Sequence, residues 1–146
     1  MFSGCGPYPL TIAKNTKAGK IIGIEKNQIA HKYAIENLKL NKAKNVEFFC
    51  GDVREIVPKI NEKFDRIVMP LPKGADTFLD IAFFCSKKGT IIHLYDFEHK
   101  NEIVLAEKKV EVVCSKANQH YKIIRIVKCG QYSPGKYRIC VDFEIL

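Results

Sequence analysis

The stretch FSGCGPY, residues 2–8, decides the predicted fold of this 146-residue chain. Two glycines spaced in this way are typical of the turn that joins a buried strand to a helix in Rossmann-like folds, where the backbone approaches a cofactor closely. Such a turn normally follows an apolar strand, and here only Met1 precedes it. The opening therefore predicts a nucleotide-type cofactor and a chain that lacks the first strand of its fold.

Strand-like and helix-like stretches alternate after this turn. We predict strands at residues 20–25, 46–50, 64–69 and 90–97, and helices at residues 9–17, 27–41, 54–60, 75–86 and 98–118. Two final strands, 121–129 and 136–145, are joined by a turn at residues 132–135 that is short enough for antiparallel pairing, whereas the helical crossovers favour parallel strands. The pattern predicts one α/β domain over residues 1–146, with a Rossmann-like, doubly wound, mostly parallel sheet that ends in an antiparallel hairpin.

The composition favours a basic protein with free thiols. The formal net charge is +8 and the pI is near 9.2, so a polyanion such as nucleic acid is a candidate partner, although solvated lysines alone explain the excess slightly better. Six cysteines show neither CxxC nor Cys–His zinc spacing, which predicts no metal site and a reduced, cytoplasmic protein. We expect Cys50, Cys85, Cys114 and Cys140 to be buried, and no apolar run reaches the length of a membrane span.

Three elements fall where a doubly wound nucleoside site needs them. The first is the turn with Gly4 and Gly6, and the second is Glu25, whose carboxylate ends the next predicted strand and could accept both hydroxyls of a ribose. The third is Asp52 with Val53, just past the following strand, where a carboxylate and a backbone amide could meet an adenine edge. Each signal alone has a plain alternative, a tight turn or a helix cap, but together they predict a cofactor site at the carboxyl edge of the sheet.

The turn departs from a dinucleotide fingerprint in a way that selects the cofactor. The third glycine of GxGxxG is replaced by Pro9, and Pro7 removes a second backbone amide. A pyrophosphate needs free amides at the start of the helix. A nucleoside cofactor without phosphate fits better, and S-adenosylmethionine is the cofactor we predict.

The loop Met69-Pro70-Leu71-Pro72 follows the predicted strand at residues 64–69. Methyltransferases that act on exocyclic amines often carry an Asn/Asp-Pro-Pro-aromatic motif at this point, and the absence of Asn, Asp and an aromatic residue here disfavours that chemistry. A proline-stiffened loop is an equal alternative. Lys73, beside the loop, is the predicted phosphate contact, whereas the other basic residues are scattered and more typical of a solvated surface.

A family resemblance is carried by the segments MFSGCGPYPL, IIGIEKN, NVEFFCGDVRE, FDRIVMPLPKGADTFLD, KKGTIIHLYDF and QYSPGKYRICVDF. Together they resemble the archaeal and eukaryotic-type tRNA (guanine-N1) methyltransferases that act beside the anticodon, and their relatives in wyosine biosynthesis. The resemblance covers essentially the whole chain. It implies a methyltransferase that uses S-adenosylmethionine on guanine 37 of tRNA or on its wyosine derivative. It also implies that the methionine-side loop comprises Phe2, Gly4, Gly6 and Pro7, the ribose site Glu25 and Lys26, the adenine site Asp52 and Val53, and the loop beside the transferred methyl and target base Pro70, Leu71 and Pro72.

Two departures from this family shape the remaining expectations. Many members have Asn where this chain has Pro70, which leaves the methylated atom open. The family's base and cation are thought to come from an upstream Glu and Arg that this chain does not contain, so its catalytic residues stay unknown. We expect that the gene start was placed at an internal Met, that a second chain completes a split protein, or that the chain is an excised domain. We also expect the isolated chain to have marginal stability, to self-associate or to pair with an upstream fragment. Transfer of an aminocarboxypropyl group, or a binding module without catalysis, are the alternatives.

Overall fold

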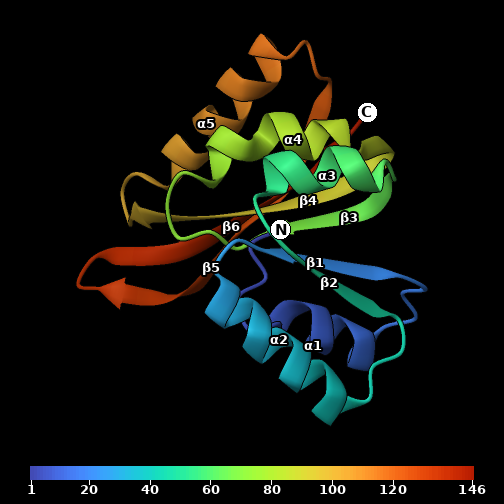
Figure 1. Cartoon of the computed structure of the whole chain (residues 1–146). Helices are drawn as coiled ribbons and strands as arrows, with labels where there is room; N and C mark the ends of the chain where they lie inside the picture. The colour runs from blue at the N-terminus through green and yellow to red at the C-terminus, as the bar shows by residue number, and fades with distance from the viewer. The chain divides into compact units, whose positions relative to one another are not determined.

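The computed structural model describes all 146 residues and forms two compact units, Met1–Ile60 and Asn61–Leu146 (Figure 1). Both units combine helices with parallel strand pairs, and the second ends in an antiparallel hairpin. The predicted α/β class, with parallel crossovers and a terminal hairpin, is therefore confirmed. That residues 1–146 act as one domain stays a prediction.

The first unit contains a two-stranded parallel sheet in which Glu25 lies opposite Cys50 at the carboxyl end. Gly6 precedes the first helix in a left-handed conformation, Pro7 occupies a first-turn position that needs no amide donor, and Asn27 caps the second helix through its side-chain oxygen. The elements are α1 (Pro7–Asn15), β1 (Ile21–Glu25), α2 (Gln28–Asn41), β2 (Val46–Cys50) and α3 (Val53–Ile60). Capping signals in the sequence thus place both helices directly after the turn and the strand end that were predicted as site elements.

The second unit contains a four-stranded sheet with the order β3-β4-β6-β5. β3 and β4 pair in parallel, whereas β4 with β6 and β5 with β6 pair antiparallel. The elements are β3 (Phe64–Met69), the 3-10 helix η1 (Ala75–Phe78), α4 (Leu79–Phe84), β4 (Ser86–His99), α5 (Ile103–Lys116), β5 (Tyr121–Ser133) and β6 (Lys136–Ile145). The hairpin strand β6 is therefore central, with β5 at the edge.

The core of the second unit lies between one face of this sheet and its helices. Ile92 and Phe143 pair across β4 and β6 and are fully buried, and Val110 on α5 is equally buried. Lys109 of α5 holds Asp96 at 2.5 Å and Glu98 at 2.6 Å on the same sheet face. Burial lowers the pKa of Lys109, but the two hydrogen bonds outweigh it and hold that pKa above its ordinary value.

Several predicted boundaries were wrong for identifiable reasons. A helix was expected to reach Ser86 and a turn to follow at Gly89, yet both residues belong to β4. The Thr90 hydroxyl stabilises this extension, because it accepts the Lys87 N–H and donates to the Phe64 carbonyl. At the other end, β4 continues to His99, so α5 starts at Ile103 instead of at residue 98.

All six cysteines are free, but Cys50 is exposed, which corrects its predicted burial. It is the last residue of β2 and shares a strand face with the buried Val46 and Phe48, but it lies at the end of the strand, beyond the buried part of that face. Cys85, Cys114 and Cys140 are buried as predicted, and burial raises the pKa of the Cys114 thiol to about 11. None of the helices is both long and apolar enough to cross a membrane.

Candidate functional site

The glycine turn is a left-handed bend that only glycine suits at its last position. Phe2, Gly4 and Gly6 all have positive φ, with values of 53°, 55° and 91°. A Cβ atom added to Gly6 would lie 2.7 Å from the Phe48 ring, and one added to Gly23 of β1 would lie 2.4 Å from it. Phe48 therefore occupies the space beside both glycines, and the turn is drawn close to β1. The space around Gly4 is open, with no heavy atom within 4 Å of an added Cβ.

The Glu25 carboxylate joins the turn to the end of β1 and the start of α2. Its Oε2 accepts the Gly4 N–H at 2.7 Å, and its Oε1 accepts the Asn27 N–H at 2.8 Å. The Ser3 N–H donates to the Ile24 carbonyl at 2.9 Å, which holds the turn along the same strand end. A carboxylate has about four lone-pair sites, so two remain on Glu25 for other donors.

Asp52 lies at the carboxyl end of the neighbouring strand. The Gly51 N–H donates to the Glu25 carbonyl at 2.9 Å, which connects the two strand ends. Asp52 caps α3 by accepting the Arg54 N–H at 2.9 Å, and its other oxygen accepts the Lys26 ammonium at 3.0 Å. The hydrogen bond from the Arg54 backbone and then that from Lys26 hold the pKa of Asp52 below its ordinary value. Asp52 is thus an anion at neutral pH.

The structure brings together most of the residues predicted for the cofactor. Gly4 contacts Glu25, Glu25 adjoins Gly51, and Lys26 contacts Asp52, all within the unit of residues 1–60. Val53 is buried in this unit with 3% of its surface exposed. Val53 could therefore contact an adenine through its backbone N–H, or through the small part of its side chain that the core leaves uncovered.

The predicted substrate loop follows β3 in the other unit. Pro70 and Leu71 are half-buried, whereas Pro72 and Lys73 are exposed. Because these residues belong to residues 61–146, their predicted place beside the cofactor stays a prediction.

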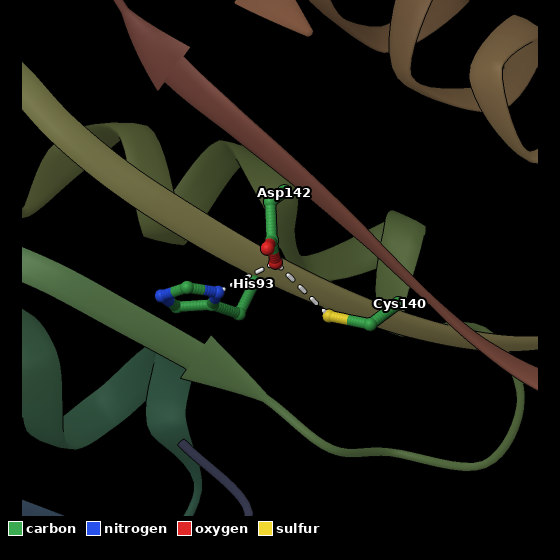
Figure 2. A group of neighbouring side chains, drawn as sticks. All are labelled: His93, Cys140 and Asp142. Atoms are coloured by element: carbon green, nitrogen blue, oxygen red, sulfur yellow. Dashed lines mark hydrogen bonds and ion pairs between the residues drawn. The ribbon is translucent and has the colours of Figure 1, made fainter. Parts of the chain in front are cut away.

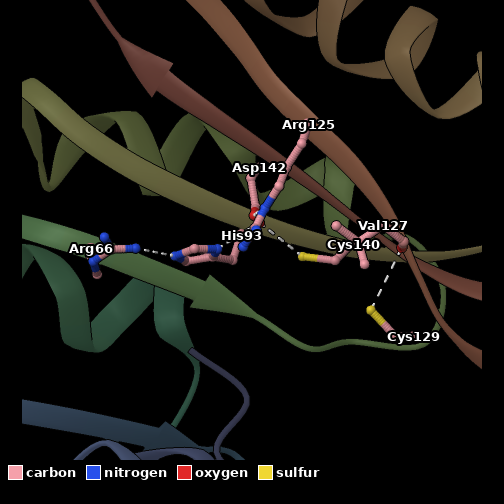
Figure 3. Close-up of polar contacts among 7 residues, drawn as sticks. All are labelled: Arg66, His93, Arg125, Val127, Cys129, Cys140 and Asp142. Carbon is pink, nitrogen blue, oxygen red and sulfur yellow. Dashed lines mark hydrogen bonds and ion pairs between the residues drawn. The ribbon is translucent and has the colours of Figure 1, made fainter. Parts of the chain in front are cut away.

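A polar cluster on the four-stranded sheet was missed from the sequence (Figure 2). His93 Nδ1 lies 2.6 Å from Asp142 Oδ1, and the Cys140 thiol donates to the same oxygen at 3.2 Å. Figure 3 adds Arg125, whose Nε donates to Asp142 Oδ2 at 2.7 Å, and Arg66, whose Nη1 lies 3.0 Å from His93 Nε2. The sequence gives His93 no partner nearby, but the register of β4 with β6 places it opposite Asp142.

This cluster has the donor types of a metal site but not the charge of one. The ligand atoms of His93, Cys140 and Asp142 lie within 4.8 Å of one another. Two guanidiniums already contact the cluster, and burial strongly raises the pKa of the Cys140 thiol. A metal ion would therefore have to displace the thiol proton beside two fixed positive charges. The same raised pKa excludes Cys140 as a thiolate nucleophile at neutral pH.

Comparison with known proteins identifies a family that matches most of the chain. Residues 1–124 match the TRM5/TYW2 methyltransferase domain. The chain is 35% identical over 146 residues to the tRNA (guanine(37)-N(1))-methyltransferase Trm5b of Pyrococcus abyssi, with 99% of this chain and 42% of that protein covered. It is 32% identical to the tRNA(Phe) (4-demethylwyosine(37)-C(7)) aminocarboxypropyltransferase of Methanocaldococcus jannaschii, with 97% of this chain and 57% of that protein covered.

A solved structure agrees with these matches. The crystal structure of M. jannaschii TYW2 in complex with AdoMet superposes with a TM-score of 0.85 at 30% identity, and it covers 100% of this chain and 67% of that one. The chain thus spans about half the length of the two relatives that it matches in sequence.

Proposed function

The chain belongs to the TRM5/TYW2 methyltransferase domain family, and from this premise we propose that it binds S-adenosylmethionine and methylates position 37 of tRNA, at guanine N1 or on its wyosine derivative. Support comes from relatives whose names give both a tRNA substrate and this position. It comes also from a structural neighbour that was solved with AdoMet. The net charge of +8 suits a nucleic-acid substrate.

The observation that carries the proposal is the Glu25 carboxylate. Its two backbone hydrogen bonds fix its orientation at the end of β1, and its remaining lone pairs can accept the two hydroxyls of a ribose. Phe2, Gly4, Gly6 and Pro7 would hold the amino-acid side of the cofactor, because the bend leaves open space around Gly4. The prolines at the start of α1 remove the amides that a pyrophosphate would need, so a nucleoside without phosphate fits this turn.

The adenine would lie at the end of β2. There the Val53 amide and the Asp52 carboxylate offer one donor and one acceptor to a base edge, and Lys26 fixes the carboxylate. When bound, S-adenosylmethionine supplies an electrophilic carbon on its sulfonium. The site residues would hold that carbon in line with a ring nitrogen or carbon of the base, which would take the methyl group and give up a proton, so that adenosylhomocysteine would be released.

The loop after β3 would meet the target nucleotide. We assign Pro70 to the cofactor's reactive end, Leu71 and Pro72 to the base, and Lys73 to a phosphate. Proline has no backbone N–H, so Pro70 can act there by shape and through its carbonyl only. The base that removes the proton from N1 is not assigned to a residue of this chain.

Aminocarboxypropyl transfer is the second candidate, because the M. jannaschii relative with that activity is 32% identical to this chain. Both reactions use the same cofactor and differ in the carbon that is attacked. Incubation with tRNA and cofactor labelled either in the methyl or in the carboxyl group separates them: methyl label in RNA supports our proposal, and carboxyl label in RNA supports the alternative. Label in neither product, despite tight cofactor binding, leaves a binding module.

We further propose that an upstream polypeptide, or a second copy of the chain, completes the catalytic unit in the cytoplasm. Each of the two sheets ends in a strand, β1 or β3, that has one partner strand. Three exposed free thiols suit a reducing compartment. Repeating the label assay with and without the upstream half of a longer relative tests the first option, and sedimentation tests the second. Full activity of a demonstrated monomer alone would contradict both.

A further inference from the structure

The two faces of the four-stranded sheet differ in character. One face carries the buried residues Ile92, Leu94, Val141 and Phe143 and contacts α4 and α5, which lie on the same side of the sheet in Figure 1. The register places a different set on the opposite face, because directly paired residues share a face. We call that opposite face the arginine face; it carries Arg66, His93, Tyr95, Arg125, Arg138, Asp142 and, at its far end opposite Lys122, Glu144.

A row of hydrogen-bonded polar side chains crosses all four strands on this face (Figure 3). Arg66 of β3 contacts His93 of β4, His93 contacts Asp142 of β6, and Asp142 contacts Arg125 of β5. A guanidinium can only donate, so His93 Nε2 accepts from Arg66 and the imidazole proton lies on Nδ1, where it donates to Asp142. His93 thus holds Arg66 at one end of the row, and Asp142 holds Arg125 at the other.

The Asp142 carboxylate accepts hydrogen bonds on both of its oxygens, but its single negative charge does not cancel the two positive charges of the arginines in the row. Burial alone would raise the pKa of Asp142, but hydrogen bonds from Arg125, His93 and Cys140 outweigh it and hold that pKa below its ordinary value. The row contains this one carboxylate and two guanidiniums, and each guanidinium uses one of its five N–H donors in the row. The Arg125 side chain is 67% exposed. Both ends of the row therefore present donors to solvent.

The adjoining hairpin adds cations and aromatic rings. Between Tyr121 and Val141 the sequence contains no Asp or Glu, whereas its basic residues are Lys122, Arg125, Lys128, Lys136 and Arg138. The Arg138 guanidinium lies 4.7 Å from the centre of the Tyr95 ring. Tyr132, 69% exposed near the hairpin turn, lies 4.7 Å from Phe97 on the same face. Guanidiniums beside exposed aromatic rings are the combination that single-stranded RNA binds, through phosphates and stacked bases.

We propose that the arginine face binds the RNA substrate, with phosphates on Arg66 and Arg125 and an unpaired base on Tyr132. The inference rests on the proposed function, since it locates a contact surface for the tRNA. His93 and Asp142 are positioning residues that hold the two arginines, and they take no part in alkyl transfer.

The test compares charge-matched variants on the two sides of the sheet. Arg66→Gln and Arg125→Gln remove one charge each from the arginine face, and Lys108→Gln removes one exposed charge from α5 on the other side. Tyr132→Ser removes the ring without a change of charge. Binding of a fluorescent anticodon stem-loop transcript with guanine at position 37 is measured by anisotropy over a range of salt, and adenosylhomocysteine binding by the same chains is measured by calorimetry.

We expect each arginine variant to weaken RNA binding about threefold to tenfold and to reduce the slope of log K against log salt by about 0.7–0.9. Tyr132→Ser should weaken RNA binding about fivefold or more with an unchanged slope. Lys108→Gln should match wild type, and adenosylhomocysteine affinity should be unchanged throughout.

Two results would overturn the inference. If both arginine variants bind RNA as Lys108→Gln does, the surface is wrong while the proposed function stands. If the wild-type chain binds adenosylhomocysteine but no RNA even at low salt, the tRNA substrate itself is wrong. Circular dichroism identifies a variant that fails to fold, and Arg66 and Arg125, on different strands, then serve as independent tests.

Discussion

Glu25→Gln is the sharpest perturbation of the proposed cofactor site. The substitution keeps the size of the side chain, but it removes the charge and turns one acceptor oxygen into a donor. In the structure the two oxygens of Glu25 accept the Gly4 and Asn27 N–H groups at 2.7 and 2.8 Å. A glutamine amide can satisfy only one of them and leaves only one acceptor for the two ribose hydroxyls.

The magnitude follows from the lost hydrogen bond to a hydroxyl. A hydrogen bond to a charged group contributes about 1.5–3 kcal/mol, which corresponds to a loss of about 10- to 150-fold in affinity for adenosylhomocysteine. Calorimetric titration measures it. Glu36→Gln is the matched control, because Glu36 is exposed on α2, and it should bind as wild type does.

A structural effect on the turn can be separated from the loss of the ligand contact. Glu25→Asp keeps the charge but retracts the carboxylate by one methylene, so it should also weaken binding. The thermal transition of each variant reports whether the turn still folds. If Glu25→Gln binds adenosylhomocysteine with wild-type affinity, the assignment of Glu25 to the ribose is refuted.

Three further predictions concern stability. Gly6→Ala should lower the free energy of unfolding by about 2–4 kcal/mol in urea titrations, because Gly6 has a positive φ and the added Cβ would collide with the Phe48 ring. Gly19→Ala is the control, since its added Cβ would lie in open space and should leave the stability unchanged. Equal stability of the two variants would contradict the packing of the turn. Ile92→Val should cost about 0.5–1.5 kcal/mol at its fully buried site, and Ile124→Val, 47% exposed, should be neutral; the reverse order would place the core elsewhere. Asp142 has a lowered pKa in the folded state, so its contribution is present above its ordinary value of 3.8 and is lost as the pH falls below it. In Asp142→Asn, the free energy of unfolding should therefore fall less steeply as the pH is lowered from about 5 to about 3. A slope equal to that of the wild type would contradict the hydrogen bonds that Asp142 accepts on the sheet.

Local pattern predicted the parts of the site that lie at strand ends. The glycine turn, Glu25 and Asp52 each follow directly from a short signal in the chain, and hydrogen bonds in the structure connect the three elements. The arrangement is local because β1 and β2 are parallel neighbours whose carboxyl ends share an edge. The family resemblance added Lys26, which the structure places on Asp52.

Contacts that depend on register could not be predicted in this way. His93 and Asp142 are 49 residues apart, and Arg125 and Asp142 are 17 apart, so only the exact pairing of β4, β6 and β5 brings them together. A slip of one residue would turn each side chain to the other face. The early start of β4 was missed for a related reason, since the side-chain bonds of Thr90 that support it are tertiary contacts.

The glycine turn, Glu25 and Asp52 together are proposed to hold an adenosine. A crystal structure of the chain with adenosylhomocysteine tests this proposal most directly. We predict both ribose hydroxyls within hydrogen-bond distance of the Glu25 carboxylate, and the adenine edge at Asp52 and the Val53 amide. A nucleoside bound elsewhere, or none at this edge of β1 and β2 in well-ordered crystals, would contradict the account.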